Sequence, residues 1–481
     1  RYLDVYQDTE GTERVRQRLD AMIAGATVAS PGACSTRPAQ GDERPTCRSN
    51  WKIRTFLSQY YRRDVNQLND QEEIVSQSSL YTDASIDLRH RGERFDFSSR
   101  ITAGYRNNLL SEEVSRSDRN DFRLSYAFAD LADVKTGIRG RIGRQTRNTG
   151  GVLGRFDGVN VAWEMNDRVR FDAVSGNPVF STADDVERSR LFYGLSSNFR
   201  PFDNSLELGV FALQQDFDGL TDRQSVGAEA RYFGSDVSVW GMVDYDTAFQ
   251  ELGIAFVQGS WRLPGNFTIS ALADHRRSPF LMLSNSVIGQ LGGEFSTFSA
   301  TMAEDELRQL ALDRSAIADT VTFGLSRPFT PRLQLNLHAS IATISSTPES
   351  AGVSATEDSE YSYYSADIVT SSLLTQGDVG IFGVRYATTE TADIFTFNID
   401  TRFPIGRSFR INPRLRIDYR ENSMDQSTQW SYRPGLRIQY RWGRHMRLEF
   451  EAGREFMQRD MPIVDQDRES YFVNLGYQFF Y

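Results

Sequence analysis

The chain contains no apolar run long enough to cross a membrane as a helix. A transmembrane helix needs roughly 18 or more consecutive apolar residues, and the mean hydropathy of this sequence is only −0.47. Transmembrane helices are therefore excluded. A membrane β-barrel is not, because its strands need apolar residues only on the side that faces lipid, so their average hydropathy stays low.

Positive charge is also scarce. The 481 residues carry 54 Lys and Arg against 64 Asp and Glu, which gives a net charge of −10. A nucleic-acid-binding protein should be basic, so we expect no nucleic-acid partner. Only Lys52 and Lys135 are lysines. Almost all cationic charge is therefore arginine.

Residues typical of enzymes are few and scattered. The sequence has no Gly-x-Ser-x-Gly motif and no metal-ligand cluster, so we expect no catalytic residues, no metal and no cofactor. The segment Gly143–Gly158 is rich in glycine and basic, but it lacks the Gly-Lys-Ser/Thr ending of a phosphate loop. We interpret it as a loop turning at Gly150-Gly151. The four histidines stand apart: His90, His275, His338 and His445.

The two cysteines, Cys34 and Cys47, lie in residues 26–50, which we interpret as a linker. Their spacing, with no histidine nearby, is poor for zinc and favours a disulfide over free thiols. A disulfide fits an oxidising compartment such as the periplasm.

Residues 1–25 have the only helical pattern near the start of the chain, with Val15, Leu19 and Ile23 on one face. The segment Tyr2–Met22 resembles the closing helices of a tetratricopeptide-repeat array. One such repeat cannot bury its own apolar face. The resemblance therefore implies further repeats upstream in a longer protein, and periplasmic protein partners that dock on them.

From Trp51 onward the apolar pattern has a period of two. In residues 409–420 the odd positions are mainly apolar and the even positions mainly arginine, and residues 430–442 alternate in the same way. This pattern predicts strands with one face against something apolar and the other against water.

Three features favour a membrane barrel over a soluble sandwich. The apolar faces end in aromatic residues, the strands are ten to fifteen residues long, and short and long connections alternate. The short connections are 166–167, 234–235, 264–265, 330–331, 405–406 and 443–444; the long ones are 66–78, 178–188, 281–318, 347–358, 421–427 and 457–466. The sequence predicts a closed antiparallel outer-membrane β-barrel over residues 51–481, with 22 strands to within two. With the N-terminal segment in the periplasm, every short turn falls on the periplasmic side.

The last strand, residues 471–481, ends on an aromatic residue. Val473, Leu475, Tyr477, Phe479 and Tyr481 share one face. This segment resembles the C-terminal insertion signal of bacterial outer-membrane barrels. The resemblance implies a Gram-negative outer membrane, contact with its lipid and lipopolysaccharide, and recognition by the barrel-assembly machinery.

Strand phasing places a set of arginines toward the lumen, eight of them on adjacent strands. One hypothesis is that this basic arc guides anionic or hydroxyl-rich solutes. The alternative is a cross-strand ladder that stiffens the wall, with Asp400, Asp418, Glu449 and Glu451 as partners. The arginines of the two groups are Arg139 and Arg141 (with Gln145 and Arg147), then Arg402, Arg410, Arg414, Arg416, Arg420, Arg433, Arg437 and Arg441.

The longest loop is 281–318, and its Met302–Ala318 segment has a helical pattern with Leu307, Leu310 and Ile317 on one side. A lumen bounded by 22 strands must be filled. We therefore favour a lid folded into the lumen over an extracellular cap.

Tetratricopeptide repeats followed by an outer-membrane barrel resemble exopolysaccharide exporters, which implies that the barrel passes a polymer. A porin for small solutes and a structural anchor or assembly component stay open as alternatives. A siderophore-type transporter is disfavoured, because only about fifty residues precede the first strand and its plug needs well over a hundred.

Overall fold

The computed structural model describes residues 50–481 except 70, 111–119, 203–204, 291–294 and 463. The predicted N-terminal helix and the predicted Cys34–Cys47 disulfide lie outside the described residues. Among the described residues, no helix is both long and apolar enough to span a membrane.

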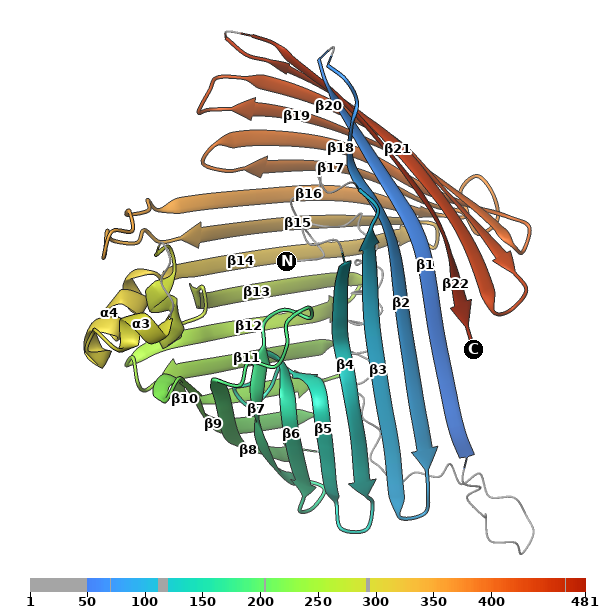
Figure 1. Cartoon of the computed structure of the whole chain (residues 1–481). Helices are drawn as coiled ribbons and strands as arrows, with labels where there is room; N and C mark the ends of the chain where they lie inside the picture. The colour runs from blue at the N-terminus through green and yellow to red at the C-terminus, as the bar shows by residue number, and fades with distance from the viewer. Residues whose placement is uncertain (1–49, 70, 111–119, 203–204, 291–294, 463) are drawn as a thin grey trace, which may run out of the picture.

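The chain forms one antiparallel sheet of 22 strands that closes on itself, because the first strand pairs with both the second and the last (Figure 1). This confirms the predicted fold and strand count. The strands are β1 (Asn50–Leu68), β2 (Ile74–Arg91), β3 (Phe95–Asn108), β4 (Asn120–Asp133), β5 (Ile138–Arg147), β6 (Gly154–Glu164), β7 (Val169–Val179), β8 (Arg190–Phe202), β9 (Leu206–Phe217), β10 (Leu220–Phe233), β11 (Val237–Asp246), β12 (Glu251–Leu263), β13 (Phe267–Ser278), β14 (Ala316–Thr330), β15 (Leu333–Ile344), β16 (Ser359–Ser371), β17 (Val379–Thr388), β18 (Ala392–Ile405), β19 (Phe409–Asn422), β20 (Thr428–Trp442), β21 (Met446–Asp460) and β22 (Gln466–Phe480).

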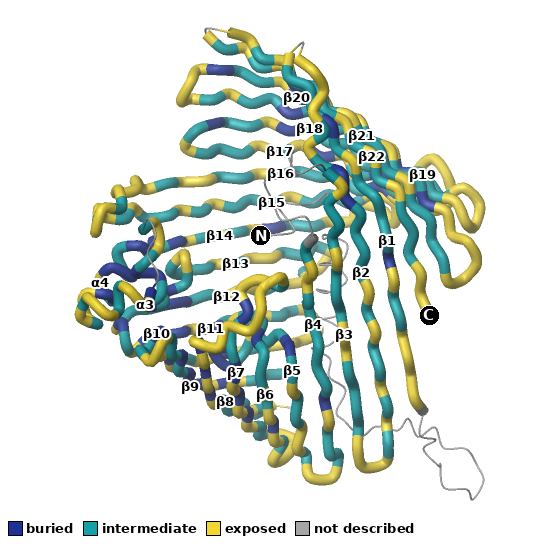
Figure 2. The backbone as a smooth tube through the Cα atoms, viewed as in Figure 1, coloured by how far each residue is buried: buried dark blue, intermediate teal, exposed yellow. Residues whose placement is uncertain are grey.

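The two faces of the sheet differ in how far their side chains are exposed, and exposed and less exposed residues alternate along many strands in Figure 2. On β20, Tyr432 and Leu436 are 41% and 38% exposed, whereas Ser431 and Gln439 on the opposite face are buried. Leaving many large apolar side chains in water would cost about 25 cal/mol per Å². The exposed apolar face is therefore the lipid-facing exterior of an outer-membrane-type barrel, and the polar face lines the lumen.

The predicted connections sort by length between the two ends of the barrel; among the other connections, the two-residue turn between β9 and β10 lies at the same end as the long loops. The six predicted short connections all fall at one end, here called the turn end, and the six predicted long loops fall at the other, the loop end. Strands of 10 to 19 residues join these ends, enough to cross the hydrocarbon layer at a tilt.

The segment between β13 and β14 is the longest connection and contains three short helices, η1 (Leu283–Val287), α3 (Phe295–Ser299) and α4 (Glu304–Asp313). The helix predicted over Met302–Ala318 therefore ends earlier. Assigning Ile317 to it was wrong, because Ile317 lies in β14 opposite Arg277 of β13. The backbone leaves the helical conformation at Arg314, and the N–H of Ile317 donates to Ser345 Oγ.

Candidate functional site

The loop of residues 148–153, at the loop end between β5 and β6, packs on the inner face of β8–β10. The backbone N–H of Gly150 donates to Glu229 Oε1 at 2.6 Å, and Arg223 Nη1 donates to the carbonyl of Gly151 at 3.0 Å. Both glycines have positive φ, and a Cβ on Gly151 would lie 2.7 Å from the ring of Phe211. The double glycine thus lets this loop narrow the lumen.

An apolar cluster forms where this loop meets the wall. Phe156 at the start of β6 is fully buried and meets Phe192 of β8 edge to face, with 5.2 Å between ring centroids. Val152, Val174 and Leu213 complete the cluster. This small apolar core therefore holds the loop against the wall, in a region of the barrel that would otherwise hold water.

Beside the loop lies a polar pocket of about 210 Å³, lined by five arginines and three carboxylates. Arg139 and Arg141 both bind Asp130, at 2.9 and 2.8 Å. Arg147 and Arg170 share Asp172 in the same way, at 3.5 and 2.8 Å. The wall of this pocket keeps an excess of positive charge, and its charged residues are Arg139, Arg141, Arg147, Arg170, Arg231, Asp130, Asp172 and Glu207.

On the wall of β18–β21, half of the predicted arc binds carboxylates, three of the four arginines across strands and Arg416 within β19. Arg414 bridges Asp400 and Glu451, at 3.2 and 3.1 Å. Arg433 bridges Asp418 and Glu455, at 3.3 and 2.7 Å. Arg416 also binds Asp418, and Arg437 binds Glu449. Arg414, Arg433 and Arg437 thus bind carboxylates of other strands, which is the pairing that the ladder hypothesis predicts.

The other half of the arc differs. Within the described part of the chain, Arg402, Arg420 and Arg441 form no ion pair with a carboxylate; Arg420 donates instead to the amide oxygen of Asn422. Arg410 donates to the amide oxygen of Gln439 at 3.4 Å. The guanidinium groups of Arg402, Arg420 and Arg441 are therefore not neutralised by a described carboxylate.

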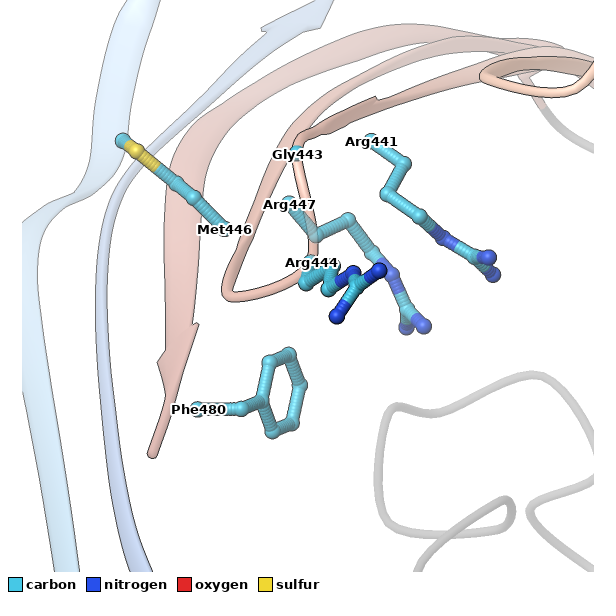
Figure 3. Close-up of a pocket in the computed structure, with 6 residues that line it drawn as sticks. All are labelled: Arg441, Gly443, Arg444, Met446, Arg447 and Phe480. Atoms are coloured by element: carbon cyan, nitrogen blue, oxygen red, sulfur yellow. The ribbon is translucent and has the colours of Figure 1, made fainter.

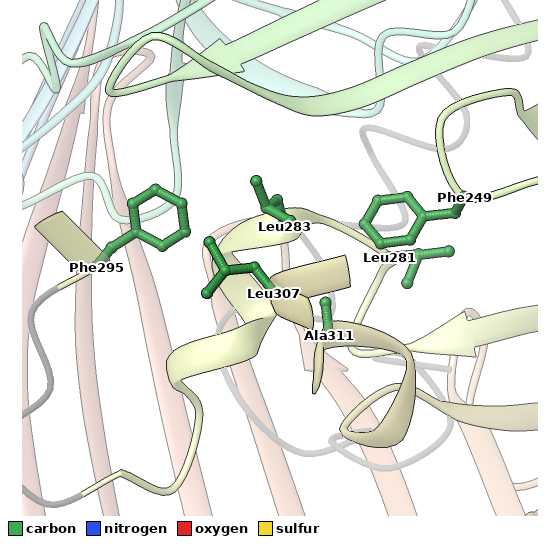
Figure 4. Packing of buried hydrophobic residues seen from close by; sticks show 6 residues of the cluster. All are labelled: Phe249, Leu281, Leu283, Phe295, Leu307 and Ala311. Atoms are coloured by element: carbon green, nitrogen blue, oxygen red, sulfur yellow. The ribbon is translucent and has the colours of Figure 1, made fainter. Parts of the chain in front are cut away.

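The segment between β13 and β14, here called the lid, packs over the loop end beside β9–β12 (Figure 1). Its centre is Leu307 of α4, which is fully buried against Leu281, Leu283 and Phe295, with Phe249 from the β11–β12 turn in the same cluster (Figure 4). Leu310 is buried on the same helix.

Polar contacts tie the lid to the barrel wall. Asp222 of β10 accepts the N–H of Ser284 at 2.9 Å and the side-chain amide of Gln215 at 2.6 Å. The lid thus covers part of one wall, and its apolar core and this buried carboxylate hold it there.

At the C-terminus, Val473, Leu475 and Phe479 are exposed on the exterior face, with Tyr477 on the same face. Tyr481 exchanges two backbone hydrogen bonds with Thr55 of β1, at 3.0 and 2.8 Å. The terminal aromatic segment is therefore part of the seam that closes the barrel.

Sequence reasoning missed the three carboxylates of the pocket, Asp130, Asp172 and Glu207, and two of its arginines, Arg170 and Arg231. The same period-two phasing that located Arg139 would have placed them on the inner face. Sequence reasoning also interpreted the Gly150-Gly151 turn as an ordinary loop, because no residue near the turn in sequence identifies Glu229 as its partner.

No protein-family model matches this chain, and no curated protein sequence matches it. Among solved structures, Pseudomonas aeruginosa OpdK with vanillate is 12% identical, with a TM-score of 0.41 over 89% of this chain and 99% of that one. A BenF-like porin from Pseudomonas fluorescens Pf-5 is 11% identical, with a TM-score of 0.41 over 89% and 98%. Acinetobacter baumannii OccAB3 is 10% identical, with a TM-score of 0.43 over 89% and 99%.

Proposed function

We propose that this protein is a channel of the bacterial outer membrane that passes small solutes and favours anions. The observation that carries the proposal is the pocket beside the inward loop, where five arginines face three carboxylates at the narrowed part of the lumen. We expect it to have no enzymatic activity.

Charge and geometry explain the preference for anions. Guanidinium groups bind carboxylates and phosphates through two parallel hydrogen bonds, so a row of them offers successive weak sites. In a narrow passage with low-dielectric walls, excess positive charge lowers the barrier for anions and raises it for cations. The carboxylates Asp130 and Asp172 neutralise part of the charge of the arginines that they bind, so a solute is held weakly enough to leave.

A small-solute channel fits this lumen better than a polymer exporter does. A long polymer needs a continuous bore, whereas the 148–153 loop covers part of the inner wall and the lid covers part of the loop end. The predicted tetratricopeptide segment, on which the exporter hypothesis depends, lies outside the described residues. A structural anchor is the second alternative, and it should give no conductance in a bilayer.

The proposed partners follow from the surface. The exposed apolar exterior fits outer-membrane lipid and lipopolysaccharide, and the aromatic last strand fits recognition by the barrel-assembly machinery. Periplasmic protein partners of the N-terminal segment stay a prediction from the sequence.

Planar-bilayer recordings across a potassium chloride gradient test the channel. We expect discrete openings whose reversal potential indicates that chloride passes more readily than potassium. Replacing Arg139 and Arg141 with glutamine should move this potential toward cations, whereas the control Arg332→Gln, in the β14–β15 turn, should not. Absence of conductance, or a wild-type channel that prefers potassium, would contradict the proposal.

A further inference from the structure

We propose that the turn end of the barrel carries a binding site for compact anions of two or more charges, formed by Arg441, Arg444 and Arg447. This deepens the proposed channel function, on which it rests for the route by which such an anion reaches the site. The binding site itself is argued from the geometry of one hairpin and the last strand.

The site lies where β20 turns into β21. Arg441 and Arg447 are directly opposite each other in the antiparallel register, and Arg444 is in the turn between them. With Phe480 of β22 they line an open pocket of about 380 Å³. Figure 3 shows the three arginine side chains on one side of the hairpin, with the Phe480 ring below them and Met446 directed away.

The arginines of this pocket are not neutralised by the protein. Higher on the same two strands, Arg433 and Arg437 each bind a glutamate of β21. Arg441, Arg444 and Arg447, by contrast, form no ion pair with any described carboxylate; Arg447 has only a 3.5 Å contact with the amide oxygen of Gln478. Like charges placed directly opposite on an antiparallel pair destabilise it. An anion bound between them would remove that repulsion.

The backbone holds the pocket in place before any ligand arrives. The N–H of Phe480 donates to the carbonyl of His445 at 2.8 Å, and His445 Nδ1 lies 2.8 Å from the carbonyl of Phe480. The Phe480 ring packs on Phe56 of β1, with 5.4 Å between centroids, and the Arg447 guanidinium lies 5.7 Å from the same ring. The hairpin and the Phe480 ring are therefore fixed before a ligand binds, and binding has to order the arginine side chains.

The donor set defines the class of ligand. Each guanidinium presents five N–H donors in a plane, which matches the oxygens of phosphate and carboxylate groups. Three uncompensated charges favour a ligand with at least two negative charges over a monovalent one. The pocket admits a compact group, and Phe480 gives it one apolar side. Phosphate groups and polycarboxylates share this chemistry.

Calorimetric titration of the purified, detergent-solubilised full chain with inorganic phosphate and, separately, with citrate tests the site. We expect wild-type protein to bind at least one of them. Arg441→Gln with Arg447→Gln should weaken binding by about tenfold or more, as expected for lost charge-assisted hydrogen bonds. Arg444→Gln should weaken it less. The matched control, Arg168→Gln with Arg332→Gln, removes two exposed arginines from other turns at the same end and should bind as wild type does.

Each outcome decides the proposal. Phosphate binding alone assigns the site to phosphate groups, and citrate binding alone to polycarboxylates. Failure of wild type to bind either anion at millimolar concentration, or equal affinity in the Arg441/Arg447 variant, overturns the site. If that variant fails to fold, Arg444→Gln, in the exposed turn, replaces it. An affinity equal to that of wild type in Arg444→Gln then overturns the site. Conductance distinguishes the two proposals. If the protein binds anions but forms no channels, the binding site stands and the channel function is contradicted. If it forms channels but binds neither anion, the channel function stands and the binding site is contradicted.

Discussion

The walls formed by β18–β21 and by β6–β12 differ in what their inner faces contact. On β18–β21, arginines and carboxylates of neighbouring strands bind each other and no described loop packs on the inner face. On β6–β12, the chain itself covers the inner face, with the 148–153 loop and the lid packed on apolar side chains. The described part of the chain thus narrows the lumen from the β6–β12 side.

The two walls should also differ in energetics. Half-exposed ion pairs contribute about 0–1 kcal/mol each, because water screens them and fixing two long side chains costs entropy. Fully buried apolar side chains contribute several times more. Substitutions on the two walls can therefore distinguish packing from charge pairing.

The largest effect is expected from Phe156→Ala. Phe156 is fully buried in the cluster beneath the inward loop, so its truncation leaves a cavity and should lower the free energy of unfolding by about 3 kcal/mol. Urea unfolding in lipid vesicles measures this. Phe323→Ala, on the exterior at 50% exposure, should cost less because lipid fills the space. Equal losses at the two positions would contradict the packed-wall description.

A second change should open the narrowed lumen. Glu229→Ala removes the acceptor of the Gly150 N–H, so the 148–153 loop should leave the wall part of the time. We expect higher or fluctuating single-channel conductance. Glu421→Ala, at the loop end of β19, is the control and should leave conductance unchanged. Identical conductance in all three proteins would show that the loop does not narrow the passage.

A smaller effect is expected on the opposite wall. In a double-mutant cycle on Arg433 and Glu455, whose side chains are 40% and 17% exposed, the coupling free energy should be about 0.5–1 kcal/mol. Urea unfolding of the two single variants and the double variant provides it. A coupling of several kcal/mol would mean that this wall is held as strongly by its charges as the other is by packing.

The smallest effect is local and depends on pH. In the turn of residues 372–378, the backbone N–H of Thr375, together with those of Leu373 and Leu374, donates to the Asp378 carboxylate and lowers its pKa from the usual 3.8. A carboxyl whose folded pKa is lowered stabilises the folded state above its unfolded pKa, and this stability is lost as pH falls through the folded value. The protection factors of these three amides, which compare their exchange with that of unstructured amides at the same pH, should therefore stay high at neutral pH and fall only below about pH 3.8.

Asp378→Asn gives the matched control. Its neutral amide accepts weaker hydrogen bonds, so the protection factors in the turn should already be lower at neutral pH and should no longer fall in acid. Unchanged exchange in this variant would show that the carboxylate does not order the turn.

The strand pattern could be predicted because it is local. Alternation in residues 409–420 and 430–442 identifies two-sided strands without any knowledge of their partners, and short turns such as 443–444 follow directly. The position of the 148–153 loop could not be predicted in this way, because it depends on Glu229, 79 residues from Gly150 in sequence.

The lid helix shows where local patterns mislead. Apolar residues continue from α4 into β14, and a helical spacing that includes Leu307 and Leu310 also reaches Ile317, which the sheet takes instead. Similarly, the phasing placed the arginines of the arc on one face, but only the register shows which of them meet a carboxylate. Exopolysaccharide export and the disulfide depend on residues before Asn50 and stay predictions.

Labelling of single cysteines on adjacent positions of β20 decides whether the strands are two-sided in a membrane. In a Cys34→Ser, Cys47→Ser background reconstituted into lipid vesicles, Gly435→Cys should react with a small membrane-impermeant maleimide through the lumen. Leu436→Cys, facing lipid, should stay unreacted until detergent is added. Equal labelling of both positions without detergent, or labelling of Leu436→Cys alone, would contradict the transmembrane barrel.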